Sequence, residues 1–333
     1  MTKVVNIEFE VGDEHLGTNP CSEIILRDKQ FCNLTEVVVR ADDTFSSLKR
    51  KVEFATILGT IQSTLTSFQF LSEEWKKNTE EERLLGVSLT GIMDNIKMSG
   101  ARTHGSFENG MFLPDALEAL REHARSTNEE WAEKLGIPPS ASITCVKPSG
   151  TVSQLVDSAS GIHARHNPYY IRRIRVDKKD PIYTFLKDAG VPCEDEAFRP
   201  ESTAVFAFPQ KAPEGAVCRT DKTAIEQLEL WLIYQRHFCE HKPSVTISVK
   251  DHEWPSVGAW VWEHFDEISG VSFLPFSDHT YQQAPFTDCT KEEYELAVSQ
   301  MPNNLDWSSF VEAEDFTIGA QTLACSSGSC DIL

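Results

Sequence analysis

The sequence lacks the features of a membrane-bound, exported or nucleic-acid-binding protein. No apolar run approaches the roughly 18 residues of a membrane span, and the N-terminal residues MTKVVNIEFEVGDEH contain no apolar stretch of a signal peptide. Basic residues are scarce: 31 Lys and Arg stand against 51 Asp and Glu, giving a net charge of −20. Such a surface repels nucleic-acid phosphate and anionic lipid. We therefore expect a cytoplasmic protein whose partners include neither a nucleic-acid polymer nor a membrane.

Internal repeats, low-complexity segments and the common metal or nucleotide motifs are also absent. The sequence has no Walker pattern ending in Gly-Lys-Ser/Thr and no CxxC pair. His237, Cys239 and His241 stand two apart before an expected strand, but the charged sequence EHK favours a solvated helix end over a metal site. We predict no metal held by protein side chains.

Apolar periodicity predicts a fold of the α/β class. Strands separated by helices of ten or more residues favour βαβ units and a largely parallel sheet, with catalytic loops at the strand ends. After the strand in LLGVSLTGIMDNI we expect a Gly-containing turn and the start of another helix. The other expected helices are 45–71, 114–136, 180–190, one from Thr223 with a capping box at Glu226, 257–265 and 290–301; the other expected strands are 141–146, 167–176, 203–208, 244–249 and 269–276.

The segment NPCSEI, residues 19–24, carries the first candidate site. In an extended segment Asn19, Cys21 and Glu23 would alternate and point to the same side, so an amide, a thiol and a carboxylate would face one substrate. The alternative is a loop that encloses a structural thiol. Cys32, in FCNL, follows closely enough for a short hairpin or loop to present both thiols to one pocket.

The segment VKPSGTVSQL, residues 146–155, carries the second candidate site. Its small and hydroxylated residues let backbone N–H groups approach an anion, and a helix starting there would direct its positive end at a phosphate. An ordinary turn from strand to helix is the alternative. The candidate phosphate-binding residues are Pro148, Ser149, Gly150, Thr151 and Ser153.

Cysteine usage points to thiol chemistry near the C-terminus. The nine cysteines are an odd number, and without an export signal we expect most of them to be reduced. Cys325 and Cys330 flank SSGS in a small, polar end segment, which favours a mobile redox tail that exchanges thiol for disulfide with a thioredoxin-like partner. A metal-binding pair would need further ligands. Five scattered cysteines receive no role: Cys145, Cys193, Cys218, Cys239 and Cys289.

Taken together and in this order, NPCSEI, FCNL, KPSGTVSQL and the near-terminal CSSGSC resemble the catalytic half of a ribonucleotide reductase large chain. The segments PYYIRRIR, DPIYTFLKDAG, SFLPF and YQQAP are similar to those of the adenosylcobalamin-dependent, class II enzymes, especially the monomeric ribonucleoside-triphosphate reductases. The resemblance implies the second half of a ten-stranded α/β barrel with a central finger loop. It gives an N-terminal lead-in at 1–16, a catalytic half-barrel at 17–315 with the finger loop near Cys21, and a flexible redox tail at 316–333.

The resemblance also implies the role of each site residue. Cys21, as a thiyl radical, would abstract the 3′ hydrogen of a ribonucleotide, Glu23 would accept the 3′-hydroxyl proton, and Asn19 would hydrogen-bond the ribose hydroxyls. Cys32 would be one of two thiols that supply electrons and become a disulfide. The turn at 148–153 would hold the substrate phosphates, and Cys325 with Cys330 would re-reduce the site. The implied enzyme is an oxidoreductase acting on CH or CH2 groups with a disulfide as acceptor, and its implied cofactor is adenosylcobalamin.

Two departures from the family keep alternatives open. In the family the partner of Cys32 lies upstream of the finger loop, so we expect a complementary N-terminal chain, with MTKVV as a true start and a recombinant fragment as the alternative. A class I fragment fed by a radical subunit is disfavoured, because SFLPF lacks adjacent tyrosines and Tyr169 and Tyr170 would point to opposite faces of a strand. The glycyl-radical class of reductases is also disfavoured, because no glycyl-radical motif stands near the end of the sequence. A non-catalytic assembly chain and a thiol oxidoreductase using only the terminal cysteines remain as rivals.

Overall fold

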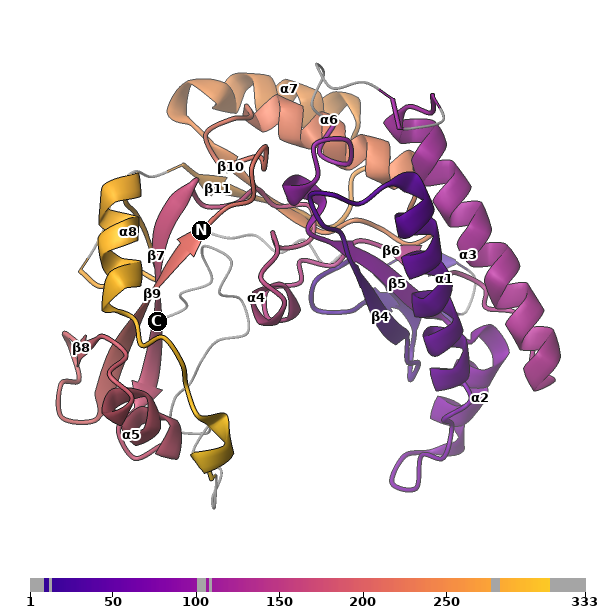
Figure 1. Cartoon of the computed structure of the whole chain (residues 1–333). Helices are drawn as coiled ribbons and strands as arrows, with labels where there is room; N and C mark the ends of the chain where they lie inside the picture. The colour runs from indigo at the N-terminus through magenta and orange to yellow at the C-terminus, as the bar shows by residue number, and fades with distance from the viewer. Residues whose placement is uncertain (1–8, 12–13, 101–105, 108–109, 277–281, 312–333) are drawn as a thin grey trace. The chain divides into compact units, whose positions relative to one another are not determined.

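The computed structural model describes residues 9–11, 14–100, 106–107, 110–276 and 282–311. The fold is mixed α/β, as predicted. The chain divides into a first unit, residues 1–165 and 214–276, and a second unit, residues 166–213 and 277–333 (Figure 1). Within the part that the structure describes, no helix is long and apolar enough to cross a membrane. The tail predicted at 316–333, with Cys325 and Cys330, lies outside the described residues.

A run of parallel strands forms the centre of the first unit. Strands β4 (Asn33–Val38), β5 (Leu85–Thr90) and β6 (Thr144–Cys145) pair in parallel, and β10 (Val245–Val249) pairs in parallel with β11 (Val271–Pro275). A parallel bridge between Val146 and Pro243, next to the ends of β6 and β10, connects these two sheets. The order along the run is therefore β4, β5, β6, β10 and β11.

Helices cover one face of this run and bury its core. Helix α1 (Phe45–Gln62) packs against β4, β5 and α3 (Leu113–Leu135), and α6 (Ala224–His237) packs against α3 and β10 (Figure 1). All six residues of β5 are buried, as expected for a central parallel strand. The remaining elements of the unit are β1 (Phe9–Val11), β2 (Glu14–Thr18), β3 (Ile25–Arg27), α2 (Glu73–Glu82), η1 (Ile92–Asp94), α4 (Val152–Leu155), η2 (Asp251–Glu253) and α7 (Trp254–Glu263).

The helix ends follow the local signals in the sequence. Thr223 and Glu226 form the predicted capping box of α6. Pro114 lies in the first turn of α3, and Gly136 ends that helix in the left-handed conformation with a φ of +68°. These signals act within a few residues, so they are readable without the tertiary structure.

Two predicted helices are shorter in the structure. The helix expected over 45–71 ends at Gln62, where the hydroxyls of Ser63 and Thr64 hydrogen-bond to backbone carbonyls one turn earlier and compete with further helix formation. Phe68 then packs against Phe31, with ring centroids 5.0 Å apart. The helix expected after Gly91 is the single turn η1.

The second unit contradicts the expectation of a largely parallel sheet. Its four strands, in the order β12 (Phe286–Asp288), β7 (Tyr169–Asp177), β9 (Thr203–Lys211) and β8 (Cys193–Asp195), are all antiparallel. The helix that follows β7, α5 (Pro181–Asp188), spans about 12 Å, whereas β7 spans about 30 Å. Because so short a helix cannot return the chain to the start of β7, the next long strand runs back beside it. The unit also contains α8 (Lys291–Gln300) and η3 (Trp307–Ser309).

Candidate functional site

The segment NPCSEI is the turn of a hairpin, which corrects the prediction of an extended segment. It connects the antiparallel strands β2 and β3. The backbone N–H of Asn19 donates to Ile24 O at 3.1 Å, and the N–H of Ser22 donates to Asn19 O at 2.9 Å. Ser22 has a φ of +60°, so side-chain direction does not alternate along the segment. Tight local hydrogen bonding, which the alternation argument ignored, decides the conformation.

The turn nevertheless brings Asn19 and Glu23 together. Asn19 Nδ2 donates to Glu23 Oε1 at 2.6 Å, while Asn19 Oδ1 accepts from the backbone N–H of Ile24 at 3.0 Å. Lys147 Nζ also donates to Glu23 Oε1. The Glu23 side chain has no exposed surface, and its second oxygen, Oε2, is buried without a hydrogen-bond partner. A buried polar atom without a partner is costly in a folded protein and calls for an explanation.

The turn lies beside the face of the parallel strands that carries Leu34 together with small and polar residues. Glu23 O accepts from the N–H of Lys242, just before β10, and Ser22 O lies 3.2 Å from the position that a Cβ on Gly270 would take. On β4 and β5, residues at alternate positions share this face. They are Leu34 and Glu36 on β4 and Gly86 and Ser88 on β5. The hairpin turn therefore lies beside this face of the sheet, while Lys147 and the segment 148–153 follow β6 directly, so part of the candidate site is a loop at a strand end.

Cys32 lies at the edge of this face, just before β4. Its Sγ is 3.4 Å, and the Sγ of Cys145 on β6 is 3.5 Å, from the position of a Cβ on Gly86, so both sulfurs lie beside this glycine, whose missing side chain leaves room for Leu34 Cδ2, 2.5 Å from the same position. Burial raises the pKa of Cys32 to about 12, while the charge of Lys147 opposes this rise and that of Glu23 adds to it. Cys32 is therefore a protonated thiol at neutral pH.

Cys145, to which we assigned no role from the sequence, is too far from Cys32 to be its disulfide partner. Strand β5 separates β4 from β6, which places the two backbones roughly 9.5 Å apart. Disulfides need Cα atoms within about 7 Å of each other. The second electron-donating thiol that the resemblance implies must therefore come from elsewhere.

The segment 148–153 forms a strand-to-helix turn, with the start of a short helix where one was expected. Ser149 has a φ of +53°, and its hydroxyl donates to Glu36 Oε2 at 2.7 Å. Burial raises the pKa of Glu36, and its hydrogen bond from Ser149 and the charge of Lys147 partly offset this rise. The Thr151 residue is exposed, whereas the buried Ser153 hydroxyl lies 2.7 Å from the hydroxyl of Ser160. The phosphate-binding role of Pro148, Ser149, Gly150, Thr151 and Ser153 remains a prediction.

A glycine holds the start of this turn in place. Gly161 has a φ of +55°, and a Cβ on it would lie 2.2 Å from the carbonyl oxygen of Lys147. Only a residue without a side chain fits this close backbone approach.

The Gly161→Ala change is expected to lower the free energy of unfolding of the full chain by about 2 kcal/mol, because alanine strains the backbone and displaces Lys147. Urea unfolding followed by tryptophan fluorescence measures it. The matched change Gly258→Ala, in α7 with open space around the new Cβ, should be neutral or slightly stabilising. Equal losses for the two variants would contradict the close-approach explanation.

Two sets of residues considered in the sequence have structural partners. His237 bonds to Glu118 at 2.8 Å at the end of α6, but Cys239 and His241 are buried, which corrects the prediction of a solvated helix end. The chain turns back after α6, so the N–H of His241 donates to Thr144 O at 3.0 Å. Across the described ranges, no group of three or more His, Cys, Asp or Glu side chains could hold a metal ion.

The basic strand of the second unit binds protein groups. Arg173 donates to Thr287 Oγ1 at 2.6 Å, and Arg175 pairs with Glu196 at 3.6 Å. Tyr169 packs against Tyr294 and Tyr170 against Phe286, so the adjacent tyrosines have different neighbours, in agreement with opposite faces.

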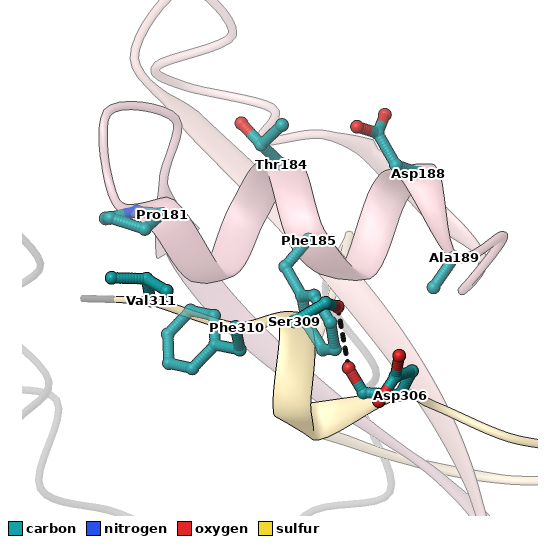
Figure 2. A pocket seen from close by; sticks show the side chains of 9 residues that line it. All are labelled: Pro181, Thr184, Phe185, Asp188, Ala189, Asp306, Ser309, Phe310 and Val311. Carbon is teal, nitrogen blue, oxygen red and sulfur yellow. Dashed lines mark hydrogen bonds between the residues drawn. The ribbon is translucent and has the colours of Figure 1, made fainter.

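The second unit also has a cavity of about 530 Å³. Figure 2 shows Phe185 of α5 and Phe310 after η3 facing it, with Ser309 Oγ donating to Asp306 O at 2.7 Å. None of the site residues predicted from the sequence lines this cavity.

Sequence comparison finds relatives with the names that the resemblance implies. No family model matches the chain. Over 320 residues it is 28% identical to the adenosylcobalamin-dependent ribonucleoside-triphosphate reductase of Euglena gracilis, covering 95% of this chain and 42% of that protein. Proteins of the same name from Lactobacillus gasseri and Lactobacillus leichmannii are 27% and 28% identical, over 97% and 95% of the chain.

Structural comparison identifies the fold. A crystal structure of a B12-dependent (class II) ribonucleotide reductase matches with a TM-score of 0.73 and 24% identity, covering 86% of this chain and 42% of that one. The chain thus has the fold of part of that enzyme. It spans less than half the length of these relatives, at 42% and 46% of the first two. The predicted similarity to class II reductases is confirmed.

Proposed function

We propose that the chain is the C-terminal catalytic part of an adenosylcobalamin-dependent ribonucleotide reductase. Its substrates would be ribonucleoside triphosphates, as the names of the relatives indicate, with diphosphates as the alternative. The observation that carries the proposal is the buried, unpartnered Oε2 of Glu23, two residues from the half-buried thiol of Cys21. A buried oxygen without a hydrogen-bond partner costs folding free energy and has no use in a purely structural turn. A general base, in contrast, needs an oxygen that is available to accept the substrate proton.

Each residue of the turn then has a chemical role. Cys21, as a thiyl radical, takes the 3′ hydrogen of the ribose, and Glu23 Oε2 accepts the proton of the 3′-hydroxyl. Asn19 holds Glu23 Oε1 at 2.6 Å and orients the carboxylate toward the ribose hydroxyls. A radical at the 3′ carbon makes the loss of the 2′-hydroxyl feasible, and Cys32, protonated at neutral pH, supplies one of the two electron-donating thiols.

The residues of the site are compatible with adenosylcobalamin. When bound, this cofactor supplies the radical that oxidises a cysteine thiol. Its cobalt is held by the corrin ring, so the protein needs no cluster of metal ligands of the kind that structural metal sites require. Cys21 lies in a hairpin turn and is only partly buried, so a group outside the sheet can approach this residue. Cys21 is therefore the residue that would face the cofactor.

The parallel run β4, β5, β6, β10 and β11 supports the finer proposal about the fold. We infer that it is the second half of a ten-stranded α/β barrel, with the turn at 19–24 as the finger loop. The turn lies on the polar face of the strands, opposite the helices α1 and α3, where a barrel would have its interior. The predicted boundaries at 16/17 and 315/316 remain part of this proposal.

A complementary N-terminal reductase chain would complete the site. By the resemblance, the partner thiol of Cys32 lies upstream of the finger loop, in the first half-barrel, and Cys145 is too far from Cys32 to replace it. Helix α1 also exposes apolar side chains at helical spacing: Phe54, Leu58 and Ile61 are 51%, 62% and 42% exposed. Such a stripe is typical of a surface that a partner covers.

The electrons would enter through the tail. Cys325 and Cys330 would reduce the active-site disulfide and be reduced in turn by a thioredoxin-like protein. The seven described cysteines are thiols and not members of a disulfide: Cys21, Cys32, Cys145, Cys193, Cys218, Cys239 and Cys289. Reduced cysteines accord with the proposed location in the reducing cytoplasm.

The rival functions explain less of the site. A non-catalytic assembly chain would have no need of a buried carboxylate with an unused oxygen, and a thiol oxidoreductase acting through the tail alone would not need Glu23 or Cys21. A class I type fragment would need a tyrosine relay, for which the differently packed Tyr169 and Tyr170 are unsuited.

Reconstitution tests the proposed function. The chain combined with a first-half reductase chain, adenosylcobalamin, a dithiol and a ribonucleoside triphosphate should form deoxyribonucleotide, because both electron-donating thiols are then present. The chain alone under the same conditions should form none. Turnover by the chain alone would overturn the split-enzyme proposal, and no turnover by the complex with any ribonucleotide would overturn the reductase.

A further inference from the structure

A lysine that received no role from the sequence lies at the centre of the site. Lys147 directly precedes Pro148, and its backbone N–H donates to Ser88 Oγ at 2.9 Å. Gly161 lies against its carbonyl oxygen. Its ammonium donates to Glu23 Oε1, and its side chain is 22% exposed. These contacts fix one positive charge among the groups of the proposed chemistry.

Acids and thiols from the turn, β4 and β6 interact with this ammonium, and β5 contributes the hydroxyl of Ser88 beside its backbone. Burial lowers the pKa of Lys147, but the charge and the hydrogen bond of Glu23 raise it, and the net pKa lies above its ordinary value. The lysine therefore stays charged. The groups that interact with it are Cys21 and Glu23 on the turn, Cys32 before β4, Glu36 on β4 and Cys145 on β6.

The way Lys147 binds Glu23 leaves one carboxylate oxygen unused. A carboxylate without surface exposure or a charged partner tends to take up a proton. Lys147 supplies the partner charge, but both it and Asn19 bind Oε1. Oε2 stays without a partner. An ammonium is a point charge that can bind a single oxygen, whereas a guanidinium tends to bind both oxygens of a carboxylate.

We propose that Lys147 is a positioning residue that binds Oε1 of Glu23 and leaves Oε2 available for the substrate proton, and that the same ammonium sets the electrostatic environment of the Cys32 thiol. The assignment deepens the proposed function and rests on it for the role of Glu23. Its electrostatic part concerns the chain alone.

Alkylation of Cys32 in the full chain tests the electrostatic part. Iodoacetamide reacts with thiolates, and peptide mass spectrometry reports the rate at each cysteine. Lys147→Met should slow the alkylation of Cys32 about tenfold between pH 8 and 10, because the loss of an adjacent positive charge raises the pKa of the thiol and lowers the fraction of thiolate. Glu23→Gln should speed it, because a neighbouring negative charge is removed while Lys147 remains.

Three controls separate charge from damage to the fold. Lys147→Arg keeps the charge and should alkylate at Cys32 nearly as the unaltered chain does. Lys76→Met, an exposed position on α2, should have no effect. Fast alkylation of the buried Cys145 and Cys239 would reveal an unfolded variant. If Lys147→Met does not fold, the Glu23→Gln and Lys147→Arg chains test the assignment instead. Slower alkylation of Cys32 in the Glu23→Gln chain would overturn it. A tenfold slowing in the Lys147→Arg chain, as large as that expected for Lys147→Met, would also overturn it.

Turnover tests the positioning of Glu23. In the reconstituted complex Lys147→Met should lower kcat at least tenfold with little change in KM, because Lys147 no longer holds Oε1 and Oε2 loses its fixed position for the substrate proton. A loss confined to KM would overturn the assignment to Glu23. If even the unaltered complex forms no product while Cys32 alkylation behaves as expected, the proposed function fails and the electrostatic part stands. Unchanged Cys32 alkylation in a folded Lys147→Met chain overturns that part, whatever the turnover.

Discussion

Glu23→Gln is expected to lower deoxyribonucleotide formation in the reconstituted complex by about 10² to 10⁴-fold, the range for loss of a general acid or base. Glutamine has the shape of glutamate and can still accept hydrogen bonds from Lys147 and Asn19 at the Oε1 position. It cannot take up a proton at the position of Oε2, which the structure leaves buried without a partner. Initial rates at saturating ribonucleotide measure the effect, since it concerns the chemical step.

The matched control is a second buried carboxylate outside the site. Glu196, in the second unit, is 4% exposed, and its Oε2 accepts from the backbone N–H groups of Phe198 and Arg199 at 2.9 and 2.7 Å. Glu196→Gln should leave turnover nearly unchanged and affect stability alone. Similar losses of turnover for Glu23→Gln and Glu196→Gln would show that removing any buried carboxylate disables the chain, and would remove the basis for a general base.

Cys21→Ser is expected to abolish turnover in the reconstituted complex. The O–H bond of serine is stronger than the S–H bond of cysteine, so a serine at this position cannot supply the radical that takes the 3′ hydrogen. The change should leave the fold intact, because serine is common in turns and the backbone N–H groups of Asn19 and Ser22 form the hydrogen bonds that close the turn at 19–24. Product formed per chain, measured beside the unaltered chain, gives the result.

The first unit shows which parts of the fold can be read from sequence. Thr223 with Glu226, and Pro114 with Gly136, act within a helix end, and both helices were predicted from them. The antiparallel sheet of the second unit was not predicted, because strand direction depends on pairings between distant residues, such as Tyr169 with Lys211. The short α5 was the available signal: its length, compared with that of β7, argues against a parallel return.

The residues of the candidate site could be predicted from the sequence, but their geometry could not. The order of motifs identified Asn19, Cys21, Glu23 and Cys32 as candidates, but the alternation argument for NPCSEI was wrong because backbone hydrogen bonds close a turn there. The geometry that joins Asn19 to Glu23 comes from that turn and not from a strand.

Lys147 was missed because its partner, Glu23, lies 124 positions away in the sequence. A lysine directly after the apolar strand ASITCV was a usable signal, since a buried lysine needs an acidic partner. Cys145 and Glu36 were not predicted as site residues for a related reason. Their place on the polar face of the sheet follows from the register of β4, β5 and β6, which is set by pairings between strands far apart in the sequence.

The central claim is that the sulfur of Cys21 reacts with the ribose. The most direct measurement is the rate of deoxyribonucleotide formation by complexes reconstituted with the Cys21→Ser chain and with a Cys193→Ser chain, whose altered residue is exposed on β8 of the second unit. We predict no product above the cofactor-free blank for Cys21→Ser and an unchanged rate for Cys193→Ser. Equal rates for the two chains would contradict the account and leave this polypeptide a scaffolding role.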